Sequence, residues 1–204
     1  VLDNLELLAV SDVTLADVDA DNGAITVTVT GGDITVTDVD TGAAGNTVTI
    51  QTIGSGNITL DDNSVAITGA TQVDLDAAGA VLSLTDNGVA DVTADTLNIT
   101  AGNNIGTGGV NIDVDFTQGS FTANNGDILM DALGAGGLTT VTSATASNGN
   151  IDISAGEDVT IAALDASGNV SITVTDPATN DGADLTVIIT DIDANPFLIT
   201  TFYP

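Results

Sequence analysis

The sequence predicts an all-β protein built as a β-solenoid of roughly ten coils of about 20 residues each. Three observations support this prediction. Short segments alternate aliphatic and polar residues, a glycine-polar-aliphatic phrase recurs along the chain, and the composition has 23 Gly but only 2% aromatic residues. Gly suits turns, and the scarcity of large aromatic side chains favours a thin aliphatic core over a globular one.

Alternating segments bounded by Gly, Asn or Asp occur along the chain, which is the pattern of strands separated by turns. Aliphatic or aromatic residues mark every second position at Ile58 and Leu60; Val73 and Leu75; Ile112, Val114 and Phe116; Ile151 and Ile153; Val159 and Ile161; and Leu185, Val187 and Ile189. Most of the intervening residues are Thr or Asp. Each segment is therefore expected to be a strand with one apolar face and one polar face.

Many strands open with Gly, a polar residue and then Ile or Val. The phrase occurs at Gly32-Asp33-Ile34, Gly56-Asn57-Ile58, Gly126-Asp127-Ile128, Gly149-Asn150-Ile151 and Gly168-Asn169-Val170. The intervals from Gly32 to Gly56 and from Gly126 through Gly149 to Gly168 are each roughly 20 residues, which is typical of one solenoid coil. Residues 1–204 are therefore predicted to form a single solenoid domain, which is a segment or subunit of a longer fibre.

A tandem β-sandwich is the alternative fold, because it also contains short strands at intervals of about 8–12 residues. Such sandwiches usually rely on a buried Trp or Tyr. This chain has no Trp and a single Tyr, Tyr203. The solenoid is therefore the preferred interpretation.

The charge composition excludes several functions. The chain has no Lys, Arg, His or Cys but has 29 acidic residues, which give a formal net charge of -29. It therefore repels nucleic acids and anionic lipid, and no apolar run is long enough for membrane insertion. No enzymatic activity is expected, because even the carboxylate pair of an inverting glycoside hydrolase would lack the cationic and aromatic residues that usually bind the sugar.

Asp-x-Asp pairs recur, and in a strand this spacing places both carboxylates on one face. The pairs or triplets are Asp17/Asp19/Asp21, Asp38/Asp40, Asp74/Asp76, Asp113/Asp115 and Asp191/Asp193. Without side-chain cations, their repulsion has to be relieved by salt, protonation or Ca²⁺, which prefers oxygen ligands.

The richest cluster is the segment 17–23. It resembles the start of an EF-hand loop, although Thr28 stands where that loop has its bidentate Glu. Ca²⁺ is therefore the one cofactor predicted, with a solvated acidic face as the alternative. The predicted ligands are Asp17, Asp19, Asp21, Asp38 and Asp40.

Three phrases between Thr93 and Ile161 resemble known repeats. They are DTLNITAGNNIGT at 95–107, NGDI at 125–128 and GNIDISAGEDVTI at 149–161. These phrases are similar to the repeat regions of filamentous-haemagglutinin-like adhesins and of giant β-strand-repeat surface proteins of bacteria. The resemblance implies a right-handed parallel β-helix that forms the shaft of an extracellular fibre.

The expected function is that of an extracellular structural protein at the cell surface, the shaft of a filament or adhesin. Unpaired strand edges at the two ends of a solenoid invite end-to-end association with another copy or with similar repeats. The candidate contact segments are 1–12 and 195–204. Their candidate contact residues are Leu5, Leu7, Leu8, Phe197, Phe202 and Tyr203.

Two other functions remain open. A calcium-dependent carbohydrate- or ice-binding module would have surface glycans or ice as its partner. Thr26, Thr28 and Thr30 could belong to a threonine array, but the runs do not recur regularly after Thr49, which favours ordinary outward-facing β-branched residues. A halophile's soluble protein would instead need salt without a specific Ca²⁺ site. Asn57, Asn98 and Asn169 begin sequons for N-glycosylation, a modification typical of exposed surfaces.

Overall fold

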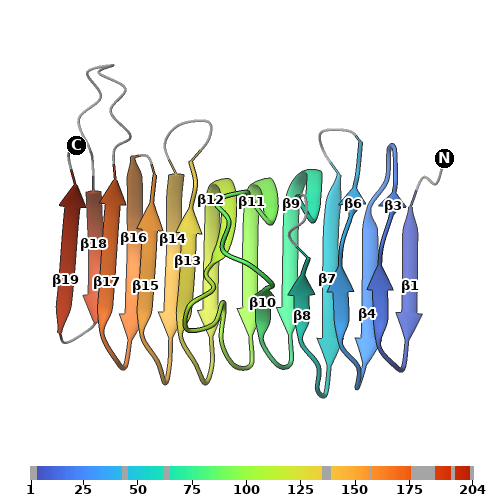
Figure 1. Ribbon diagram of the computed structural model, residues 1–204, viewed down its shortest axis with the longest axis horizontal. Coiled ribbons are helices and arrows are strands. Elements are labelled where there is room, and N and C mark those ends of the chain that lie inside the picture. The colour runs from blue at the N-terminus through green and yellow to red at the C-terminus, as the bar shows by residue number, and fades with distance from the viewer. Residues whose placement is uncertain are drawn as a thin grey trace.

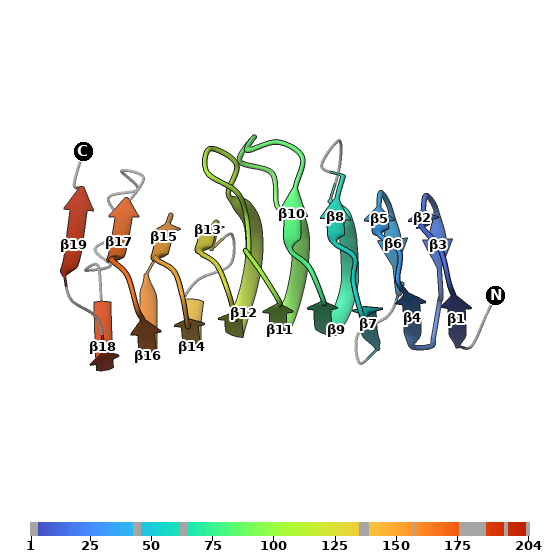
Figure 2. The same cartoon turned by 90° about the horizontal axis from the view of Figure 1, so that it is seen from below.

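The computed structural model describes residues 4–42, 46–61, 65–134, 139–156, 158–175, 187–193 and 196–202. The regular elements in these residues are all β-strands, and they wind into an elongated rod (Figures 1 and 2). In Figure 1 the nearer strands run upward and the farther strands run downward as the chain passes from N to C, so the coil is right-handed. Neighbouring strands pair in parallel, which confirms the β-solenoid and shows that the alternative of a tandem β-sandwich is wrong.

The strands line three faces, which we call A, B and C. Face A contains β1 (Leu5–Ala9), β4 (Ile25–Thr30), β7 (Thr47–Ile53), β14 (Thr139–Ala146), β16 (Val159–Ala166) and β18 (Val187–Asp193). Face B contains β2 (Val13–Leu15), β5 (Ile34–Val36), β8 (Ile58–Leu60), β10 (Val81–Ser83), β13 (Ile128–Ala132), β15 (Ile151–Ala155), β17 (Val170–Thr175) and β19 (Phe197–Phe202). Face C contains the short strands β3 (Val18–Asp19) and β6 (Val39–Asp40).

Three long strands connect faces C and A: β9 (Ile67–Ala77), β11 (Val92–Ala101) and β12 (Ile112–Ala123). The start of β9 pairs with β6 on face C, while its end pairs with β7 on face A. The start of β12 pairs with β13 and its end with β14, and from β13 onward the described residues of each coil form only two strands. One column of buried alanines runs through both kinds of coil, from Ala77 through Ala101, Ala123 and Ala146 to Ala166.

Equivalent residues of successive coils stack into ladders. On face B the ladder consists of Val13, Ile34, Ile58, Val81, Ile105, Ile128, Ile151, Val170 and Phe197. The ladder passes from Val13 to Phe197 in eight steps, so the average coil is somewhat longer than predicted and the coils are fewer than ten. Backbone spacing of about 4.8 Å between strands places each side chain in contact with the next one.

One rung of the face A ladder has no side chain. Leu97 on β11 is followed by Gly119 on β12 and Val141 on β14. The rings of Phe116 and Phe121 fill this position, edge to face, with centroids 5.3 Å apart and planes at 60°. The two aromatic residues thereby replace an aliphatic rung with a larger packing unit.

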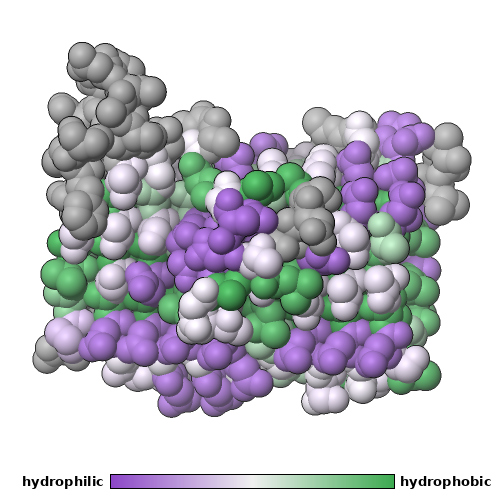
Figure 3. All heavy atoms as spheres, in the orientation of Figure 1, coloured by the Kyte–Doolittle hydropathy of each residue, from purple (hydrophilic) through white to green (hydrophobic). Residues whose placement is uncertain are grey.

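The Gly-polar-Ile phrase marks the corner that leads into face B. A Cβ added at Gly149 would collide with the Gly126 carbonyl oxygen, and one at Gly168 with the side-chain oxygen of Asn150. The coils approach so closely at this corner that a side chain does not fit. Figure 3 shows a band of hydrophilic residues along the lower edge of the rod, where the strands behind turn into face B.

The polar residue of the phrase forms a second ladder through its side-chain oxygen. This oxygen accepts a hydrogen bond from the backbone N–H of the equivalent residue one coil later. The donor-acceptor pairs are Asp33 to Asp12 (3.0 Å), Asn57 to Asp33 (2.7 Å), Ala80 to Asn57 (2.8 Å), Asp127 to Asn104 (3.0 Å), Asn150 to Asp127 (2.7 Å) and Asn169 to Asn150 (2.8 Å). The ladder satisfies a row of backbone donors at the corner.

Candidate functional site

The five predicted metal ligands lie around one corner of the rod, which we call the N-terminal acidic corner. Strands β3 and β6 pair so that Asp19 is directly opposite Asp40. The pKa of Asp19 is raised, first by desolvation and then by the negative charges of Asp17, Asp40, Asp38 and Asp21. Figure 3 shows hydrophilic residues gathered over β3 and β6. The fold therefore brings together acids that belong to two successive coils and are far apart in the sequence.

A tighter group of carboxylates lies elsewhere. Within the described part of the chain, three acidic side chains have oxygens within 4.8 Å of one another only at Asp86, Asp113 and Asp131. We call this group the central acidic site. At the N-terminal acidic corner the carboxylates are more dispersed, and Asp40 Oδ1 already accepts a hydrogen bond of 2.8 Å from the Gly42 N–H.

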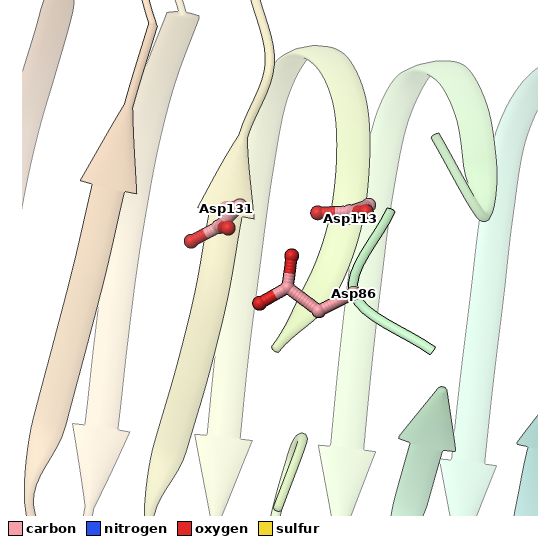
Figure 4. Close-up of side chains that lie close together, drawn as sticks. All are labelled: Asp86, Asp113 and Asp131. Carbon is pink, nitrogen blue, oxygen red and sulfur yellow. The ribbon is translucent and has the colours of Figure 1, made fainter. Parts of the chain in front are cut away.

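Three successive coils supply the central acidic site (Figure 4). Asp86 lies in the loop 84–91 that joins β10 to β11, Asp113 lies near the start of β12, and Asp131 lies in β13. Asp113 and Asp131 are opposite each other in the ladder between β12 and β13. Figure 4 shows the three carboxylates gathered beside the same short stretch of the sheet, at the point where the coil changes from three strands to two.

Asp113 is the buried member of the central acidic site, with only 1% of its surface exposed. Its Oδ2 accepts a hydrogen bond of 2.9 Å from the Gly88 N–H, which attaches the loop 84–91 to β12. Its backbone N–H donates to Asp91 Oδ2 at 3.0 Å, and its carbonyl oxygen accepts from the Asp91 N–H at 2.7 Å. Its Oδ1 is buried and has no hydrogen-bond partner among the residues that the structure describes. An orphaned carboxylate oxygen in such a position is costly unless it is protonated or binds a cation.

Electrostatics at the central acidic site disfavour three ionised carboxylates. Burial raises the pKa of Asp113, the backbone N–H groups of Gly88 and Asn87 oppose the shift, and the charges of Asp131 and Asp86 add to it. Burial likewise raises the pKa of Asp131, while the side-chain amide of Asn111, 2.7 Å from Asp131 Oδ1, opposes it. The sequence contains no side-chain cation that can offset this repulsion.

Sequence reasoning finds only one member of this site. The sequence marks Asp113 as half of the pair Asp113/Asp115, but Asp115 is not a member of the three-carboxylate group. The interval from Asp113 to Asp131 is shorter than one coil, and Asp86 lies in a loop whose path cannot be read from strand periodicity. The segment Asp86-Asn87-Gly88 carries only a turn signal.

The predicted self-assembly residues lie at the two ends of the rod. Leu5 and Leu7 point toward the core and are half-buried, whereas Leu8 is 71% exposed. Phe197 also packs partly against the core, and its neighbour Leu198 is 60% exposed. The side chain of Phe202 and the whole of Tyr203 lie outside the described residues. Figure 3 shows hydrophobic surface at both ends.

The three glycosylation candidates are placed differently. Asn57 and Asn98 are half-buried, and the Asn98 amide donates to Asp74 Oδ1 at 2.8 Å. Asn169 is exposed at the face B corner. Glycosylation of the three residues remains a prediction, for which Asn169 has the most accessible side chain.

The threonine array expected of an ice-binding face is short. Thr26 of β4 is opposite Thr49 of β7, but the next coil places Asp74 at this position. On face B, Thr14, Thr35 and Thr59 stack over three coils, and Leu82 follows. Neither column extends along the rod as a regular threonine surface.

The chain matches no family model, no curated protein and no solved structure. The described residues contain no helix that is long and apolar enough to cross a membrane. A functional proposal therefore rests on the geometry of the chain itself.

Proposed function

We propose that this protein is a structural shaft at the outside of a cell, extended by stacking its end coils on like coils. The observation that carries the proposal is the open edge at each end of the described solenoid. At the first coil, β1, β2 and β3 each pair with a strand on one side only, and at the other end β18 and β19 do the same. Free backbone donors and acceptors on parallel strands are a template for another strand.

The two ends match each other on faces A and B. A next copy stacked on β18 and β19 would place its own β1 beside β18 and its own β2 beside β19, in the register that relates one coil to the next, while its β3 on face C would have no partner among the described strands. Half-buried Phe197 would then be covered by Val13 of the next copy, as the central rungs of the face B ladder are covered by their neighbours, and half-buried Leu5 and Leu7 would lie beside β18. Such a head-to-tail contact does not close on itself, so it generates a filament instead of a dimer. The same contact could join like coils of one longer chain.

The charge of the rod favours growth along its axis. A formal net charge of -29 on a chain without side-chain cations makes sideways approach of two rods unfavourable at low salt. The ends present apolar surface and backbone edges, and these attract across a short distance. End contacts should therefore form before lateral ones.

Substitution of a single edge residue tests this proposal. Leu5 N–H donates inward to the Ala24 carbonyl oxygen at 2.9 Å, so the alternate residues of β1, including Leu8, direct their backbone groups to the open edge. Leu8→Pro removes an outward donor without removing a bond to β4. We expect the unaltered protein to form filaments visible by electron microscopy, and Leu8→Pro to prevent its own polymerisation and to shorten wild-type filaments when mixed in at a small fraction.

The matched control is Leu8→Ser, which removes the exposed apolar side chain but keeps the N–H. It should still polymerise, though more weakly. Discrete monomers of the unaltered protein at high concentration and physiological salt would contradict the shaft proposal. Filaments of unchanged length in the presence of Leu8→Pro would show that growth does not use this edge.

A further inference from the structure

We propose that Asp86, Asp113 and Asp131 bind one Ca²⁺ ion, which fastens the loop 84–91 to the two coils that follow it. All three ligands come from one chain, so this inference is independent of the proposed assembly into filaments. The predicted ligands at the N-terminal acidic corner belong to a different part of the rod.

The spacing of the carboxylates fits a single ion. Ca²⁺ binds oxygen at about 2.3–2.6 Å, so two ligands on opposite sides of the ion are about 4.6–5.2 Å apart. The oxygens offered by Asp86, Asp113 and Asp131 all lie within 4.8 Å of one another. They can therefore contact the same ion with little movement of the backbone.

Asp113 gives evidence for a bound ligand that is independent of the clustering of the three carboxylates. Its side chain is almost fully buried. Its Oδ2 accepts a hydrogen bond from the Gly88 N–H, whereas its Oδ1 has no hydrogen-bond partner among the described residues. A cation at this position would satisfy the orphaned oxygen and offset the repulsion from Asp86 and Asp131.

The chemistry of the donors selects the kind of ion. The ligands are hard carboxylate oxygens, and the chain has no His or Cys for a softer metal. Ca²⁺ tolerates irregular coordination and takes six to eight oxygens, so water or backbone carbonyls can complete the shell around three carboxylates. Mg²⁺ demands a regular octahedron and gives up its water reluctantly, which disfavours it at a site formed by a loop and two strands.

The position of the site gives the ion a structural role. The loop 84–91 is held to β12 by the Gly88 hydrogen bond, and Leu84 and Val89 in this loop are 53% and 45% exposed. Asp86, in the same loop, is exposed as well. Bound Ca²⁺ would restrain this loop over the junction between the three-strand and two-strand coils.

Calorimetric titration of the chelator-treated protein with calcium chloride tests the inference. In about 0.15 M NaCl, which screens diffuse counterion binding, we expect one saturable site per chain at the central acidic site. Asp86→Asn changes an exposed loop residue and should weaken that site at least about tenfold. Asp113→Asn should do the same, with circular dichroism used to verify that the variant is folded.

Two controls carry the same charge change. Asp115→Asn lies two residues further along β12, and Asp19→Asn lies in the N-terminal acidic corner; neither should alter the site. Hydrogen exchange at the Gly88 N–H should slow when Ca²⁺ is added to the unaltered protein and should not slow in Asp86→Asn. An absence of saturable binding, binding unchanged in Asp86→Asn, or binding lost in Asp19→Asn would overturn the inference.

Discussion

At the residue scale, amide side chains relieve much of the repulsion between acidic residues. Asp74 accepts hydrogen bonds from Gln72 and Asn98, at 2.7 and 2.8 Å, and Asp76 accepts one from Gln51 at 2.7 Å. From the sequence, we expect salt, protonation or Ca²⁺ to reduce the repulsion between the carboxylates of such Asp-x-Asp pairs. The structure supplies neutral donors instead: Gln72 from the same strand, and Gln51 and Asn98 from the two neighbouring coils, at positions that only the register reveals.

Glycine at the face B corner gives a prediction at the same scale. Gly149→Ala should lower the free energy of unfolding by about 1–3 kcal/mol or more, because its Cβ would press on the backbone of the preceding coil at Gly126. Urea denaturation of the chain measures this change. Gly108→Ala is the control, since no atom lies within 4 Å of the added Cβ, and its stability should stay within about 0.5 kcal/mol. Equal effects at the two positions would contradict close coil contact at the corner.

At the element scale, β12 combines the two aromatic residues with the glycine that makes room for them. A Cβ at Gly119 would lie 2.8 Å from Cζ of Phe121 and 2.9 Å from the Leu97 carbonyl oxygen. A regular aliphatic ladder would place a branched side chain at this rung. In β12 the buried side-chain volume is therefore maintained by the strand as a whole and not at each position of the ladder.

A double-mutant cycle tests this exchange of volume. Gly119→Ala alone should cost about 1–3 kcal/mol through overpacking, and Phe121→Leu alone about 1–2 kcal/mol through lost contacts. Because leucine lacks the Cζ that the new methyl group would strike, the double variant should lose at least about 0.5 kcal/mol less than the sum. Thermal and urea denaturation would measure the coupling. Strict additivity would show that the ring and the glycine do not share one space.

At the whole-molecule scale, stability should depend on pH in an unusual direction. The pKa values of Asp19, Asp113 and Asp131 are all raised above the ordinary 3.8, so the folded state binds protons more readily than the unfolded chain. Stability contributed by these groups is present at low pH and is lost as pH rises through their folded pKa values. The net charge of -29 acts in the same direction, because protonation reduces self-repulsion.

We therefore expect the chelator-treated protein to gain thermal stability as pH falls from 7 toward about 4.5. Differential scanning calorimetry at several pH values and constant ionic strength measures this dependence. In millimolar Ca²⁺ the gain should be smaller, because the ion already offsets the charges of Asp86, Asp113 and Asp131. A melting temperature that falls steadily between pH 7 and pH 5 would contradict the expectation.

The sequence by itself determined the all-β solenoid, the direction of its apolar faces and the glycine-rich corner. These features depend on the alternation of apolar and polar residues and on a sequence repeat of about the length of one coil. Both are local properties of the chain. Val73 and Leu75 or Ile151 and Ile153 point inward because every second residue of a strand faces the same side. The predicted acids of the N-terminal corner came together for the same reason, since Asp19 and Asp40 occupy equivalent positions of adjacent coils.

The tertiary structure alone decided three features: the junction between three-strand and two-strand coils, the filling of the Gly119 position by two aromatic rings, and the convergence of Asp86, Asp113 and Asp131. These features depend on loop length, that is, on the number of residues between equivalent positions of successive coils. On face B this number is smaller from Ile151 to Val170 than from Val170 to Phe197. A change of one residue in this number turns a side chain from the surface to the core. Local pattern therefore defines the strands, while the path of each loop defines which side chains of different coils meet.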